Sequence, residues 1–122
     1  MLVYAIIVAA LGIIVAIAHS MISERRLLGP LYAEPQSGVL ATKQMQNIFR
    51  AVFHMPSLAW AGLGVAVLLN RLQGGSDLLP YLAMTIFALS GAGNLLALRR
   101  PHPGGIILLL AAIATFSDIW FN

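Results

Sequence analysis

The three histidines of this 122-residue chain are the side chains best suited to chemistry, and each lies at the edge of a long apolar stretch. Imidazole and carboxylate groups are the usual nitrogen and oxygen ligands of zinc, iron, manganese and copper. Glu24 follows the first histidine by five residues. The sequence therefore predicts a metal site for a divalent transition metal, with one ligand each from His19, Glu24, His54 and His102.

Two alternatives fit the same residues. The spacing contains no His-x-x-His or His-x-x-x-His pair, so no single helix supplies two ligands. Histidine also suits the headgroup zone of a membrane, where its ring is half buried and half wet, so the residues can form a polar cluster without metal. A site for a polar or acidic small ligand is the other alternative. A b-type haem would need two histidines facing each other inside the bundle, which His19 and His54 fit poorly.

Two arginines near these histidines are candidates for binding an anion or a lipid headgroup. Arg50 lies one turn before His54, and charged residues within a membrane usually face the bundle interior and mark function. An arginine near the interface can instead extend its side chain to lipid phosphate groups. Arg25 is the second candidate, and a pair with the adjacent Glu24 would contribute little at a surface.

The composition identifies the class of protein. Hydrophobic residues make up 60% of the chain and charged residues only 9%, whereas a soluble domain carries about 25% charged residues. The absence of cysteine excludes disulfides, thiolate metal sites and thiol redox chemistry. The seven Lys and Arg residues are scattered near the ends of apolar stretches. We therefore expect the lipid bilayer, and not nucleic acid, as the partner.

Four apolar stretches are long enough to cross a bilayer, which takes about 20 residues in a helix. They predict an all-α integral membrane protein with a single domain over residues 1–122. We expect a four-helix transmembrane bundle running up-down-up-down, with one longer cytoplasmic connection between the first two helices. The helices are predicted at about residues 2–20, 40–70, 78–98 and 104–121.

The basic residues predict an orientation. Cytoplasmic connections of membrane proteins carry an excess of Lys and Arg, and only Arg71 falls on the side opposite to the other six. We therefore expect both termini outside, in the periplasm of a bacterial inner membrane, and the histidines on the cytoplasmic side. The six residues on the cytoplasmic side are Arg25, Arg26, Lys43, Arg50, Arg99 and Arg100.

Small residues predict close contacts between helices, because they let backbones approach. Gly91 and Gly93 form such a patch in the third helix, so leucine at either should destabilise the bundle. Arg71 is predicted to contribute almost nothing to stability, and Asp118, near the C-terminus at the outer level, is expected to need no special explanation. Pro56 is expected to kink the second helix. Small residues four positions apart predict two further contacts, at Gly12 with Ala16 and at Gly62 with Ala66.

The size and helix number are similar to those of small multidrug-resistance transporters and of the four-helix membrane enzymes that conjugate glutathione. The transporters use a glutamate within their first helix, and residues 2–18 contain no acid. The charged helix motif of the enzymes is also missing. We expect a non-catalytic subunit or a self-associating interaction module, in a homo-oligomer or a larger membrane complex. The alternatives are a protein that binds a metal or small ligand through the His/Glu residues, and a small transporter.

Overall fold

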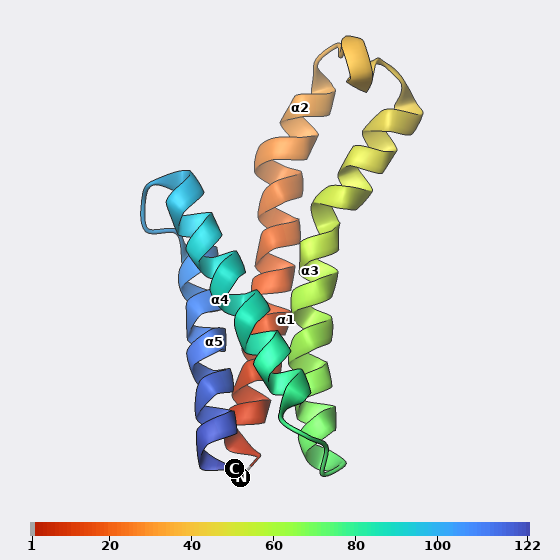
Figure 1. The fold of residues 1–122 in the computed structure, drawn as a ribbon. Coiled ribbons are helices and arrows are strands. Elements are labelled where there is room, and N and C mark those ends of the chain that lie inside the picture. Colours follow the sequence, from red (N-terminus) through yellow and green to blue (C-terminus); the bar gives the residue numbers. More distant parts are fainter. Residues whose placement is uncertain (1) are drawn as a thin grey trace.

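The computed structural model of the chain describes residues 2–122, and every regular element in that range is helical (Figure 1). Four helical segments, Val3–Ala33, Lys43–Leu72, Leu78–Leu98 and Pro103–Phe121, are long and apolar enough to cross a membrane. The prediction of an all-helical chain with four such segments is confirmed. The elements in order are α1 (Val3–Ser23), η1 (Glu24–Leu28), α2 (Gly29–Ala33), η2 (Gly38–Ala41), α3 (Lys43–Leu72), α4 (Leu78–Leu98) and α5 (Pro103–Phe121).

The first helical segment is longer than predicted. The sequence predicted its end near residue 20, but α1, the π-type turn η1 and α2 follow one another without a break. The segment passes Pro30, which lies in the first turn of α2 directly after the wider turn of η1, where its missing N–H is tolerated. The helix ends at Ala33, and the next residue, Glu34, has an extended backbone, because a residue that precedes proline disfavours the helical conformation.

The helix α3 follows a capping residue, Thr42, and bends near its proline. The side chain of Thr42 accepts a hydrogen bond from the backbone N–H of Met45, at 3.3 Å, which satisfies one of the free donors of the first turn. The predicted start near residue 40 lies in the short turn η2 instead. Pro56 lies inside α3. In Figure 1 the N-terminal part of α3 leans outward from its C-terminal part, as a missing hydrogen bond allows.

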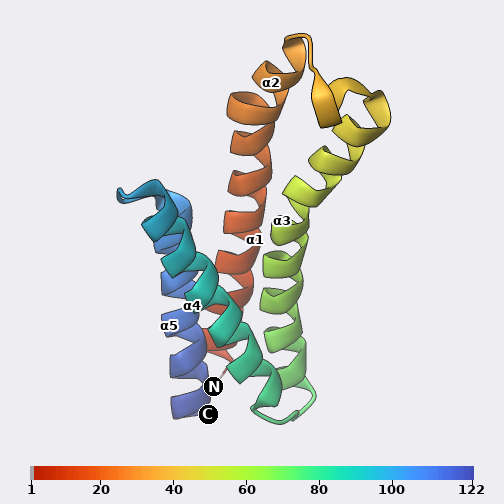
Figure 2. The same cartoon turned by 45° about the horizontal axis from the view of Figure 1, so that its top comes forward.

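The helix α1 is central to the packing. It contacts α3 and α5 extensively, and α4 packs mainly against α5, while α3 and α4 share a smaller contact. The two termini and the turn between α3 and α4 lie at one end, and the other two connections lie at the opposite end (Figures 1 and 2). Segments of 31 and 30 residues are about 45 Å long. The first segment and α3 therefore extend past the shorter α4–α5 pair.

Glycines make the closest contact between α1 and α3. A Cβ atom on Gly12 would lie 2.6 Å from the carbonyl oxygen of Trp60, and one on Gly64 would lie 2.9 Å from the carbonyl oxygen of Val8. The small-residue spacing predicted this role in α3 for Gly62. That assignment is wrong, because a Cβ atom on Gly62 would meet no atom of residues 2–122 within 4 Å.

The small-residue patch of α4 is only partly a packing surface. A Cβ atom on Gly91 would lie 3.0 Å from the carbonyl oxygen of Gly105 and 2.9 Å from Cγ of Leu109, so this glycine lets α4 approach α5. At Gly93 a Cβ atom would have no neighbour within 4 Å among the described residues. The predicted packing role is therefore correct for Gly91 and wrong for Gly93, which lies on a different face of the helix.

A buried ion pair joins α3 to α5 at the end that holds the termini. Nε of Arg71 donates to Oδ2 of Asp118 at 2.6 Å, and the Asp118 side chain is 0% exposed. Nη1 of Arg71 lies 2.8 Å from Oδ1 of Asp77. The side-chain amide of Asn122 donates to Oδ1 of Asp118 at 2.9 Å. The expectation that Asp118 needs no special explanation is therefore wrong, since a buried carboxylate requires a partner.

Candidate functional site

A hydrogen-bonded network links the first helical segment to α3 and contains two of the predicted site residues. One ring nitrogen of His54, Nε2, lies 2.9 Å from Oε1 of Glu24, and the other, Nδ1, lies 2.9 Å from Oγ of Ser20. The hydroxyl of Ser20 is in turn hydrogen-bonded to Oγ of Ser57 at 2.8 Å. Both nitrogens of the His54 ring are thus engaged, and these contacts orient the imidazole.

Arg50 supplies the positive charge of this network. Its Nε atom lies 2.9 Å from Oε1 of Glu24. This contact is an ion pair without a well-aligned hydrogen bond, because Nε is buried and has no hydrogen-bond partner among residues 2–122. The guanidinium group also lies 5.2 Å from the ring centre of Tyr32, within cation–π range. Glu24 is therefore paired with Arg50 on another helix, and Arg25 is not among its ion-pair partners in the described chain.

The other two predicted ligands lie apart from this network. Nε2 of His19 lies 3.2 Å from the carbonyl oxygen of Phe53, and the His19 ring stacks on Phe53 and meets Trp60 edge-on. His102 caps α5, where its Nδ1 accepts from the N–H of Gly104 at 3.2 Å. No group of three His, Asp or Glu side chains within reach of one metal ion occurs among residues 2–122. Metal binding by the four residues stays a prediction.

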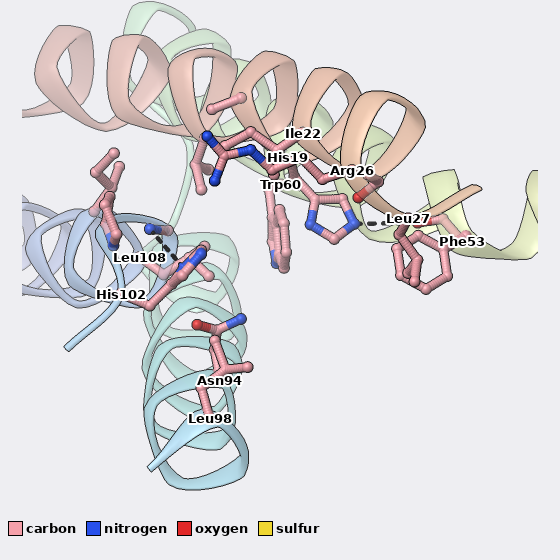
Figure 3. A pocket seen from close by; sticks show the side chains of 16 residues that line it. His19, Ile22, Arg26, Leu27, Phe53, Trp60, Asn94, Leu98, His102 and Leu108 are labelled. Carbon is pink, nitrogen blue, oxygen red and sulfur yellow. Dashed lines mark hydrogen bonds between the residues drawn. The ribbon is translucent and has the colours of Figure 1, made fainter. Parts of the chain in front are cut away.

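A cavity of about 280 Å³ lies between the α1–α3 pair and the α4–α5 pair (Figure 3). Figure 3 shows His19 of α1, Asn94 of α4 and His102, the cap of α5, around this space. Arg26 is the fourth polar residue that we consider here, and it lies at the end of the cavity formed by η1. Much of the remaining wall is apolar and includes Val15, Ile22, Phe53, Trp60, Leu98, Ile107 and Leu108.

Backbone contacts determine which ring nitrogens of the two cavity histidines can donate. A carbonyl oxygen only accepts, so Nε2 of His19 carries the proton in its contact with Phe53 and Nδ1 is an acceptor when the ring is neutral. A backbone N–H only donates, so Nδ1 of His102 is the acceptor and Nε2 carries the proton. The two rings therefore present opposite hydrogen-bonding groups.

Two further polar groups complete the lining. Oδ1 of Asn94 is buried and has no hydrogen-bond partner in the described part of the chain. It is the second acceptor of the lining residues, in addition to Nδ1 of His19. The exposed guanidinium of Arg26 supplies several donors and a positive charge. A molecule that fills the cavity would thus meet two acceptors, two kinds of donor and one positive charge in an otherwise mostly apolar space.

The structure does not bring the two predicted anion-binding arginines to one pocket. Arg25 lines a shallow depression on α1 and η1, with Met21 and Ile22 among its neighbours, while Arg50 is held by Glu24. Sequence reasoning also missed Ser20 and Ser57 as members of the network. The available signal was spacing, because Ser20 and Glu24 are four residues apart, as are Arg50 and His54, so each pair shares a helix face.

Comparison with protein families, curated proteins and solved structures finds no match to this chain.

Proposed function

We propose that this chain is an integral membrane protein that binds a small amphipathic molecule with an anionic head in the cavity between its two helix pairs. One observation carries the proposal: Asn94 belongs to the cavity wall, and its buried Oδ1 lacks a hydrogen-bond partner among residues 2–122. An unsatisfied buried acceptor costs about 1–3 kcal/mol, and a donor on a bound molecule would remove that cost. The volume of about 280 Å³ lies near the lower end of ligand sites, roughly 300 Å³.

The polar groups define the chemistry of the ligand. Arg26 and the Nε2–H of His102 would donate to negatively charged oxygens, such as those of a phosphate. Oδ1 of Asn94 and Nδ1 of His19 would accept from hydroxyl groups. Trp60 and Leu108 would contact an apolar tail. This combination of phosphate, hydroxyl and tail is that of an anionic glycerol phospholipid, with phosphatidylglycerol as the simplest probe.

The matched pair Arg26→Gln and Arg25→Gln tests this function, because both changes remove one exposed arginine and only Arg26 lines the cavity. We expect binding of phosphatidylglycerol to fall about tenfold in Arg26→Gln, the equivalent of one charge-assisted hydrogen bond, and to change less than about twofold in Arg25→Gln. Native mass spectrometry in detergent measures both, with zwitterionic phosphatidylcholine as the reference lipid. Equal losses in the two variants, or equal binding of the two lipids, would contradict the proposal.

A second candidate is the interaction module predicted from the sequence. The observation in its favour is an apolar face on the part of α3 that precedes Pro56, where Ile48, Phe49 and Val52 are all exposed. Their spacing places them on one side of the helix, and α3 extends past the α4–α5 pair there (Figure 2). A helix from a second copy or from a larger membrane complex would cover this face.

We further propose an orientation in the bacterial inner membrane, with both termini in the periplasm and an up-down-up-down course. The excess of Lys and Arg at the end opposite to the termini supports it. The chain has no cysteine, so single cysteines report the sides. Ser37→Cys and Pro101→Cys should resist an impermeant thiol reagent in intact cells, and Ser76→Cys should react. Reaction at position 37 from outside would reverse the orientation.

In the turn after α3, Ser76 is a better position for a reporter cysteine than the neighbouring Gly75. A Cβ atom on the neighbouring Gly75 would collide with the side chain of Asn70, whereas the Asn70 amide contacts Ser76 only through its backbone carbonyl oxygen. A cysteine side chain at position 76 therefore leaves that contact in place.

A further inference from the structure

The network of Ser20, His54 and Ser57 borders a second hollow, which shares no lining residue with the cavity. This groove has a volume of about 290 Å³, and its apolar lining includes Ile17, Leu58 and Ala61. Ile17 and Leu58 are 55% and 76% exposed and belong to two segments that are apolar enough to cross a membrane. The groove therefore faces lipid, with polar side chains on its floor.

Ser20 and His54 line the groove, and the His54 ring contacts the carboxylate of Glu24, which lies outside the lining. A serine hydroxyl is a weak nucleophile until a neighbouring base takes its proton. Nε2 of His54 lies 2.9 Å from Oε1 of Glu24, and an ionised carboxylate only accepts, so the ring proton of neutral His54 lies on Nε2. Nδ1, 2.9 Å from Oγ of Ser20, is then free to accept the serine proton.

Arg50, Glu24 and Ser57 lie where they can support an attack by Ser20. The charge of Arg50 lies beside Glu24, so Glu24 can orient and stabilise the imidazolium that forms, as the carboxylate of a nucleophile–base–acid set does. The hydroxyl of Ser20 donates to Oγ of Ser57, 2.8 Å away, so it must rotate to turn its proton toward Nδ1 of His54. Hydroxyl groups rotate, so the proton of Ser57 can be donated to the oxygen of a carbonyl that Ser20 attacks.

We propose that Ser20 is the nucleophile of an esterase site whose substrates are fatty-acyl esters entering from the lipid-facing groove. Oγ of Ser20 forms a bond to the acyl carbon while its proton passes to Nδ1 of His54. The ester C–O bond then breaks, and the departing alcohol takes that proton. Water, delivered from the membrane boundary, attacks the acyl-serine and gives a proton to Nδ1. The fatty acid leaves as Ser20 recovers its proton, so the step needs no oxidant or cofactor.

This activity goes beyond ligand binding in the cavity and uses different residues. The acyl chain would lie along Ile17, Leu58 and Ala61, and its ester carbon would reach the hydroxyl of Ser20. Ser20 and His54 are the catalytic residues, Ser57 is the donor to the carbonyl oxygen, and Glu24 is a positioning residue that acts through His54.

An alkyl fluorophosphonate tests the site in the full-length protein in detergent. Activated serines displace its fluoride and form an Oγ–P bond, which adds a mass that peptide mass spectrometry locates. We expect the label on Ser20, and a labelling rate at least about 100-fold lower in His54→Gln, the usual contribution of a general base. Ser117→Ala is the control, because this hydroxyl belongs to α5 and bonds to a carbonyl of its own helix.

Ester hydrolysis provides an independent readout. We expect the protein to release 4-nitrophenolate from a 4-nitrophenyl acyl ester, and Ser57→Ala to slow this release by about 100-fold, as loss of one donor to the carbonyl oxygen does. A folded wild-type protein whose Ser20 carries no label would overturn the proposal. So would an unchanged labelling rate in His54→Gln. The wild-type measurement needs no variant, so a variant that fails to fold leaves the test intact.

Discussion

Replacement of Arg71 by glutamine is expected to lower the free energy of unfolding by about 3–5 kcal/mol, the usual cost of removing one partner from a buried ion pair. Nε of Arg71 lies 2.6 Å from Oδ2 of Asp118, whose side chain is 0% exposed, and Arg71 itself is only 13% exposed. Glutamine has no charge and too short a side chain to replace the guanidinium. Unfolding of the purified protein in mixed micelles, by titration with a denaturing detergent, measures the change.

Three control variants separate the buried pair from charge in general. Arg100→Gln removes the same charge from an exposed position and should stay within about 0.5 kcal/mol of the wild type. Asp77→Asn should also cost little, because the Asp77 side chain is 50% exposed. Asp118→Asn added to Arg71→Gln should recover much of the loss, since no unpaired charge is then buried. Equal effects of Arg71→Gln and Arg100→Gln would show that the pair does not stabilise the bundle.

Alanine at Gly64 is expected to lower the free energy of unfolding by about 1–3 kcal/mol, as overpacking typically does. The new Cβ atom would lie 2.9 Å from the carbonyl oxygen of Val8 and 3.1 Å from Cα of Ala9. Both are backbone atoms, so α1 and α3 must separate to make room. Gly12→Ala should act in the same way, because its Cβ atom would lie 2.6 Å from the carbonyl oxygen of Trp60.

Gly62→Ala is the matched control for this contact. It lies two residues away in the same helix, and its Cβ atom would meet nothing within 4 Å among residues 2–122. Both changes replace glycine by a better helix former, worth roughly 0.5–1 kcal/mol in either position, so their difference reports the contact with α1 alone. The same detergent titration serves here. If Gly64→Ala and Gly62→Ala are equally stable, the close approach of α1 and α3 is not a source of stability.

The all-helical fold and the four membrane-length helices could be predicted from the sequence because they depend on consecutive residues. A helix satisfies its own backbone hydrogen bonds, so a long apolar run is sufficient to make one in lipid. The end of the first segment was predicted wrongly for a related reason. The charges of Glu24 and Arg25 mark a change of surroundings, and a helix passes from lipid to water without a change of backbone conformation.

The partners of the polar side chains could not be predicted in the same way. Spacing places Ser20 and Glu24 on one face of their helix, but α1 is apolar on every side except at its end, and such a helix carries no pattern that states its rotation. The contact of that face with His54 joins residues 30 and 34 positions apart. Likewise Arg71 and Asp118, 47 positions apart, seemed unimportant in the sequence because each lies near the end of its own helix.

The sequence by itself therefore determined which segments are helical and apolar, because both properties follow from local composition and backbone hydrogen bonding. The tertiary structure alone decided how far each helix is rotated about its axis and which helix it meets. That rotation depends on the fit of small residues such as Gly12 and Gly64 across helices that are distant in the chain. The rotation of the helices places His54 beside Glu24, whereas His19 lines the cavity together with His102. The two histidines are separated because one helix face can meet only one neighbour.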